Sequence, residues 1–154
     1  MRGAITAGLA VLLGAGSLPA LAHQIALKDL EIVHPNAMEP SSSKIKDVMI
    51  FMTIHNRGKG SDRILSASSP LAKSVVIENG SPAGEPGIAL PAGGTVAFKR
   101  EGAHIEIKGL TEELTGYETF PLWLTFEKAG KVEIEVMVEA NEDALDSSKE
   151  EKRK

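Results

Sequence analysis

The 154-residue sequence predicts an all-β protein, an antiparallel β-sandwich or barrel, for three reasons. Short segments rich in β-branched residues recur along the chain, and Gly, Pro, Ser and Asn separate them. Several of these segments alternate apolar and polar residues, which is typical of a half-buried strand. Beyond the apolar amino-terminal segment, no window of helical length carries an apolar stripe with the helical period. Many short strands at this spacing favour a sandwich or barrel over other fold classes.

Residues 1–22 are typical of a secretory signal peptide. Arg2 supplies a short positive region, an apolar stretch follows it, and small residues stand at positions 20 and 22. We therefore expect cleavage after Ala22, a mature domain over residues 23–140 and a periplasmic location. Cleavage would leave His23 at the new amino terminus, where its α-amine and its Nδ1 could chelate one metal ion together.

The first two strands are predicted to form a hairpin. If Lys28-Asp29 makes a two-residue turn, Ile25 faces Ile32 and His23 faces His34. Opposed residues on paired strands have Cβ atoms about 4.5–5.5 Å apart, so both imidazoles could reach one ion. Lys-Asp is a weaker turn sequence than Asn-Gly or Asp-Gly. Taken alone, His34 beside a proline is also typical of a simple strand end.

The remaining strands follow in order along the chain. Alternation is clearest at 120–126 and 132–138, where the even-numbered residues are apolar and are expected to face the core. In the segment 103–108, Ile105 and Ile107 are expected to point inward and His104 outward. Further strands are predicted at 29–34, 47–55, 62–67, 73–78 and 96–98, one helical turn at 111–114, and a solvated, charged tail at 141–154.

Composition excludes several kinds of site and partner. The chain has no Cys, which excludes disulfides and thiolate ligands, so any metal must be bound by nitrogen, oxygen or thioether sulfur. The formal charge of −4 argues against a nucleic-acid partner. After signal cleavage no apolar stretch reaches the ~20 residues of a membrane span. No nucleophile motif, phosphate loop or HExxH motif is present, so we predict no enzyme activity.

Several stretches resemble the periplasmic copper chaperones called PCuAC. They are His34-Pro35, 51–58 (FMTIHNRG), 61–70 (SDRILSASSP), 90–96 (LPAGGTV), His104-Ile105 and 122–130 (LWLTFEKAG). The resemblance runs from residue 23 to residue 139. It implies a cupredoxin-like β-sandwich, copper as the bound ion, and a copper-receiving periplasmic or membrane protein as the partner. We expect a monomer or a weak dimer.

The resemblance also implies that the usual Cu(I) site of the family is lost. That site uses two His and two Met, but Glu78, Gly80 and Glu106 stand where a His and both Met are expected, and only His104 remains. Thioethers select Cu(I), whereas imidazole and carboxylate suit harder divalent ions. The pattern is similar to a PCuAC subgroup that binds Cu(II) through a histidine brace, in which an amino-terminal His and a second imidazole supply three nitrogens.

Cu(II) is therefore the predicted ion, with His23 as the amino-terminal ligand. His34 is the first candidate for the second imidazole, because it lies opposite His23 in the predicted hairpin. His104 is the second candidate, and His55, which ends a predicted strand, is the third.

An axial ligand is harder to choose from the sequence. Met38 lies four residues beyond His34, in an expected loop that could fold back, and it is the chosen candidate. Glu78 is a possible oxygen donor. Alternatively, Glu78, His104 and Glu106 form a separate divalent-ion site, or only a solvated patch.

The sequence thus predicts a periplasmic protein that carries, stores or delivers copper. A histidine-brace copper oxygenase is one alternative. The aromatic content of 4% disfavours it, because such enzymes generally offer a flat aromatic surface to a polysaccharide. A metal-free adaptor that retains only the fold is the other alternative.

Overall fold

The protein is all-β, as the sequence predicts. The computed structural model describes residues 24–78 and 86–141, and these contain no helix. The predicted signal peptide, His23, Gly80 and residues 142–154 lie outside the described residues. The strands are β1 (Gln24–Leu27), β2 (Leu30–Met38), β3 (Val48–Asn56), β4 (Asp62–Ser68), β5 (Ala72–Glu78), β6 (Ile88–Leu90), β7 (Thr95–Phe98), β8 (His104–Leu110), β9 (Thr119–Phe126) and β10 (Gly130–Glu139).

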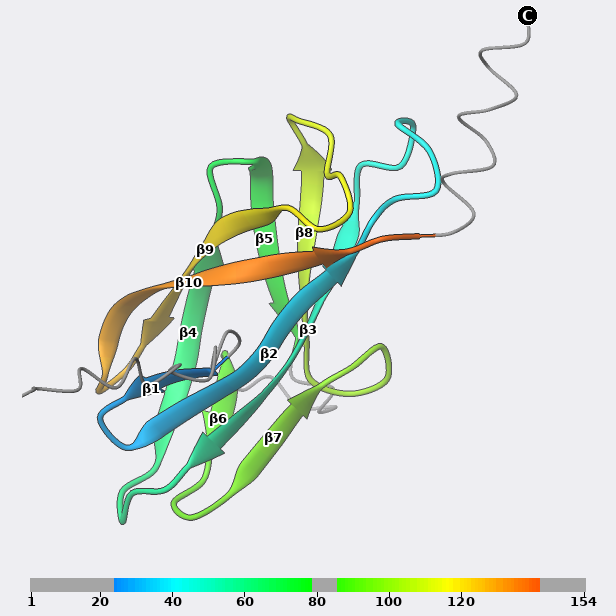
Figure 1. Cartoon of the computed structure of the whole chain (residues 1–154). Coiled ribbons are helices and arrows are strands. Elements are labelled where there is room, and N and C mark those ends of the chain that lie inside the picture. Colours follow the sequence, from blue (N-terminus) through cyan, green and yellow to red (C-terminus); the bar gives the residue numbers. More distant parts are fainter. Residues whose placement is uncertain (1–23, 79–85, 142–154) are drawn as a thin grey trace, which may run out of the picture.

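All ten strands belong to one curled sheet (Figure 1). Its order is β5-β8-β3-β2-β10-β9-β4-β6, while β1 pairs with β2 and β7 pairs with β3. Among the described strands only β2 and β10 pair in parallel. In Figure 1, β9 and β10 run across β5 and β8 at a steep angle, so the inner faces of the curled sheet cover one another.

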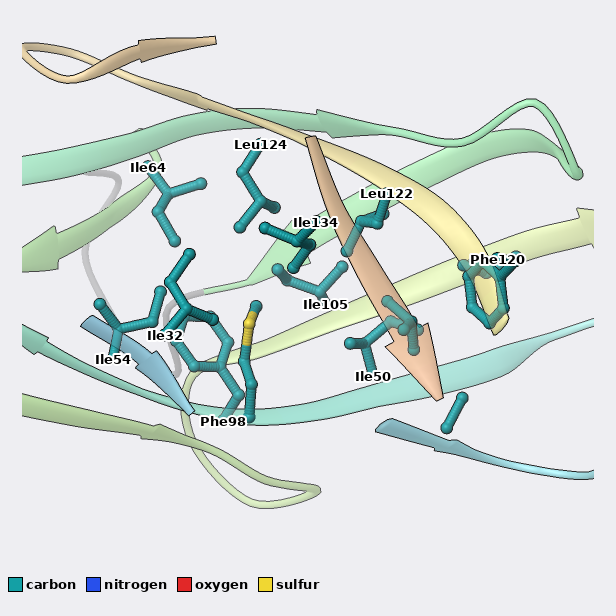
Figure 2. Close-up of a cluster of buried hydrophobic side chains, with 14 of the residues drawn as sticks. Ile32, Ile50, Ile54, Ile64, Phe98, Ile105, Phe120, Leu122, Leu124 and Ile134 are labelled. Atoms are coloured by element: carbon teal, nitrogen blue, oxygen red, sulfur yellow. The ribbon is translucent and has the colours of Figure 1, made fainter. Parts of the chain in front are cut away.

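The core consists of the inward-facing residues of these strands, and their alternation follows the sequence prediction. Phe120, Leu122, Leu124 and Phe126 of β9 are all buried. Ile105 and Ile107 of β8 are fully buried, and so are the apolar residues at 134, 136 and 138 of β10. Figure 2 shows side chains from strands far apart in the sequence meeting in this single cluster.

Two local predictions differ from the structure. Strand β6 was not predicted, because its three residues are too few to display a period. The helical turn predicted at 111–114 is absent, and this segment is irregular instead. Its Leu114 is buried, which explains why an apolar residue stands in an otherwise polar stretch.

Within the described segments, no helix is long and apolar enough to cross a membrane.

Two buried polar side chains hold the loops at one end of the sheet. Asn56 donates from Nδ2 to the carbonyl oxygens of Gly60 (2.9 Å) and Leu90 (3.0 Å). Asp62 accepts from the backbone N–H groups of Arg63 (2.7 Å), Lys128 (2.9 Å) and Ala129 (3.0 Å). The Asp62 carboxylate therefore fastens the start of β4 to the turn between β9 and β10.

We predict that Asp62→Asn lowers the free energy of unfolding by about 2–4 kcal/mol. The amide replaces one acceptor oxygen by a donor, which would face a backbone N–H. Urea denaturation followed by circular dichroism measures the change. Glu133→Gln, on the exposed face of β10, is the control and should change stability by less than about 0.5 kcal/mol. Equal stabilities of the Asp62 variant and the wild type would contradict this role.

Candidate metal centre

The amino-terminal hairpin has the register that the sequence predicts. Strand β1 pairs with β2 so that Gln24 lies opposite Val33 and Ile25 opposite Ile32. Lys28 forms the turn with a positive φ of 52°. The pairing that the structure describes therefore ends at Gln24 and Val33, one residue short of His34 on β2. Because His23 is outside the described residues, its pairing with His34 stays a prediction.

His34 lies in a β-bulge, which the sequence did not predict. The pairing of β2 with β3 shifts between Val33 and Asn36, and His34 has a φ of 51°. This left-handed backbone costs a non-glycine residue about 1–2 kcal/mol, although His is one of the residues enriched there. Pro35 follows, and a bulge is one of the few places in a sheet that accept proline.

The bulge changes the direction of the His34 side chain. In regular alternation residue 34 would face inward, as the buried Leu30 and Ile32 do. After the bulge, Pro35 and Ala37 take the inward direction instead, and His34 is exposed. Bulges commonly re-aim one side chain beside a functional site. The imidazole is consequently kept out of the core and presented on the outer face of β2.

Two strands share the edge of β2 on either side of this bulge. Strand β1 pairs with β2 up to Val33, and β10 pairs with it from Asn36 onward, with Met137 opposite Asn36. Met137 is half-buried and lies on the outer face of β10. Met137 therefore lies on the neighbouring strand, level with a residue two positions, or about 7 Å, along β2 from His34.

Met137 was not among the ligands chosen from the sequence. It does break a run of charged residues on the outer face of β10, since Lys131, Glu133 and Glu135 precede it and Glu139 follows. An apolar residue on an exposed face was the available signal. Its closeness to His34 depends on the parallel β2–β10 pairing, which links residues about 100 positions apart and has no local signature.

Met38 does not lie in a loop, so that expectation is wrong. It is the last residue of β2 and lies opposite Glu139 of β10. Met38 is 46% exposed. Four residues of strand separate it from His34, which corresponds to roughly 13 Å. Met38 therefore cannot fold back toward His34 as the sequence analysis assumed.

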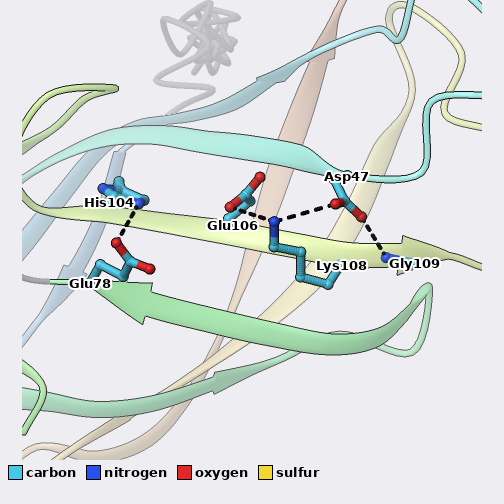
Figure 3. A network of polar contacts seen from close by, with 6 residues as sticks. All are labelled: Asp47, Glu78, His104, Glu106, Lys108 and Gly109. Carbon is cyan, nitrogen blue, oxygen red and sulfur yellow. Dashed lines mark hydrogen bonds and ion pairs between the residues drawn. The ribbon is translucent and has the colours of Figure 1, made fainter.

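His104 lies on a different part of the sheet and already has two partners. Its Nε2 is 3.3 Å from Oε2 of Glu78, and its Nδ1 is 2.9 Å from the carbonyl oxygen of Gly102. Figure 3 shows Glu78 and His104 facing each other across β5 and β8. The order β1-β2-β3-β8 places about 14 Å between β1 and β8. One ion could not reach both His104 and the start of β1.

The alternative divalent site of Glu78, His104 and Glu106 is not formed. Glu106 is 2.8 Å from Nζ of Lys108, which also lies 3.3 Å from Asp47 (Figure 3). In the described part of the chain no three His, Asp or Glu side chains come together as a metal site. The cluster is therefore a row of ion pairs.

His55, the third imidazole candidate, also has a partner. Its Nδ1 is 2.8 Å from Oγ1 of Thr95.

Comparison with known proteins relates the whole sheet to one family and one structural group. The family model LpqE-like, described as "Putative lipoprotein LpqE-like", matches residues 25–138. A search of curated protein sequences finds no match.

Three solved structures are similar. The copper-bound PCuAC domain from PmoF2 is 28% identical with a TM-score of 0.69, covering 77% of this chain and 99% of that domain. The apo PCuAC domain from PmoF1 is 25% identical with a TM-score of 0.71, covering 77% and 100%. The Cu(I) form of DR1885 from Deinococcus radiodurans is 23% identical with a TM-score of 0.58, covering 84% and 85%.

The contacts of Asp47 with Gly109 and Lys108 lead to a prediction for acid titration. The N–H of Gly109 and then the ammonium of Lys108 lower the pKa of Asp47 below its ordinary 3.8. Because a lowered pKa favours folding only while the group is ionised, this contribution is present above pH 3.8 and is lost as the pH falls through the folded-state pKa. Carboxyl ¹³C NMR should show this lowered midpoint. Lys108→Met should raise it only in part, since the Gly109 N–H remains. A complete return to 3.8 would contradict the leading role of Gly109.

Proposed function

Because the chain belongs to the LpqE-like family, and its fold resembles a copper-bound PCuAC domain, we propose that it is an exported protein that binds and carries copper. Copper is its cargo, so no catalytic group is required. The resemblance extends over 99% of that copper-bound domain, which means that the whole fold corresponds, and not one motif. A copper-receiving protein in the periplasm or the membrane would be its partner.

Within this function, Cu(II) is bound by a histidine brace made of His23 and His34. The register of the first hairpin carries the proposal, because Gln24 lies opposite Val33 and one further pair would bring residue 23 to the level of His34. The exposure of His34 is compatible with a ligand role, since its residue is not packed in the apolar core. An amino-terminal His would add its α-amine and its own imidazole. Three nitrogen donors favour Cu(II).

Met137 replaces Met38 as the proposed axial thioether. Its partner on β2, Asn36, is two residues or about 7 Å from His34, whereas Met38 lies roughly 13 Å from His34 along β2. A single weak thioether beside three nitrogens leaves the preference for Cu(II) unchanged. His104 is not a ligand in this proposal, because β3 and β2 separate its strand from β1.

Export by a cleaved signal peptide is required by this site. Only cleavage after Ala22 gives His23 a free α-amine. The family is described as a lipoprotein. These 154 residues contain no Cys, the residue to which bacterial lipoproteins attach their lipid. We therefore propose that this segment is exported without an attached lipid.

We predict that tight Cu(II) binding requires an amino terminus at His23. The reference pKa of an α-amine is about 7.7–8.0, so a competing metal deprotonates it readily near neutral pH. Isothermal titration of protein that begins at His23 should give one Cu(II) per chain, and electron paramagnetic resonance should give nitrogen hyperfine splitting. Protein with one additional residue before His23 is the control and should bind far more weakly. Equal affinities would rule out the brace.

We also predict that His34→Ala removes most of the Cu(II) affinity, while His104→Ala removes little. The two variants differ in location, because His34 lies on β2 beside the start of β1, whereas His104 lies on β8, two strand spacings or about 10 Å from β2. The same titration measures both. Circular dichroism should show that both remain folded, since neither side chain belongs to the core. The reverse order of affinities would move the site to β5 and β8.

A further inference from the structure

A second group of sulfur donors lies on the outer face of β2 and β3. The pairing of these strands places Asn36 opposite Phe51 and Ala37 opposite Ile50. Continued by one residue, this register brings Met38 opposite Met49. Opposed residues have Cβ atoms about 4.5–5.5 Å apart, and the flexible Met side chain can bring two sulfurs closer than that. The two thioethers can therefore meet over the sheet.

The burial of these methionines differs from that of a core methionine. Met52, also on β3, is 4% exposed and packs in the core cluster. Met49 is half-buried on the opposite face of β3, and Met38 is 46% exposed. Most buried Met residues fill gaps in a core. That explanation accounts for Met52 but not for a pair on the outer face.

The oxygen donors beside this pair are already bonded to nitrogen. Glu106 lies opposite Met49 and is 2.8 Å from Nζ of Lys108. Glu139 lies opposite Met38 and accepts a hydrogen bond of 2.7 Å from Nδ2 of Asn36. Because Asn36 lies opposite Met137, this hydrogen bond crosses the line between Met38 and Met137. Met38 is therefore separated from Met137 and has Met49 as its sulfur neighbour.

From this arrangement we propose that Met38 and Met49 form a second metal site, which takes a soft monovalent ion such as Cu(I). Thioether sulfur selects Cu(I) over divalent ions. A filled d shell imposes no fixed geometry, so Cu(I) and Ag(I) accept few ligands. The site is separate from the brace, roughly 13 Å from His34 along β2. It does not rest on the brace and would exist without it.

The test uses ¹³C-methyl methionine NMR on protein that begins at His23, titrated with Ag(I), a redox-inert substitute for Cu(I). Of the five Met residues, the four after Met1 each give one methyl signal. The methyl signals of Met38 and Met49 should shift together and saturate at one equivalent. The signal of Met52 should stay unchanged and serves as the internal control.

Variants separate this site from the brace. Met38→Leu combined with Met49→Leu should weaken Ag(I) binding by roughly tenfold or more and leave Cu(II) binding intact. Met52→Leu is the matched control, because it changes the same residue type on β3 without touching the outer face. His34→Ala should leave the two methyl shifts unchanged. The proposal is overturned if neither methyl signal shifts, if only one shifts, or if the double variant binds Ag(I) as tightly as the wild type.

Discussion

The left-handed backbone at His34 is the constraint on which much of this structure depends. Strand β2 pairs with β3 along one edge, and its other edge is divided between β1 and β10. The bulge lies at that division. It reverses the inward and outward directions, so that Pro35 and Ala37 continue the core while a polar imidazole stays outside. Without it, an imidazole would enter an apolar interior, where an unpaired polar group is costly.

The outer face of the sheet is divided by the same strand pairings. On β5 and β8, polar residues of the outer face form the contacts Glu78–His104 and Glu106–Lys108. These contacts occupy the imidazole and the carboxylates that a metal would need. On β2, β3 and β10, the outer face instead carries His34 and three thioethers, at Met38, Met49 and Met137. Donors for a soft or a nitrogen-bound ion therefore lie around β2, away from the ion pairs.

The predictions that succeeded rest on local patterns. The hairpin register followed from one turn and from matching apolar residues on its two arms, and the burial of residues 120–126 followed from simple alternation. The errors concern distant pairing. Met38 was expected in a loop beyond the strand predicted at 29–34, but β10 pairs with this segment and β2 extends to Met38. Strand β6 has only three residues, too few to display a period, and it forms by pairing with β4, more than 20 residues earlier in the chain.

The amino-acid sequence by itself determined the fold class, the inward face of most strands and the first hairpin. These properties depend on residue type and on spacing within one segment, where side-chain direction follows the strand period. Only the tertiary structure decided that His34 faces outward, that Met137 lies on the strand beside it, and that the β2–β3 register leads toward Met38 and Met49. Those relations arise because hydrogen bonding between strands distant in the sequence sets their register, and a register shift of one residue changes which face a side chain occupies.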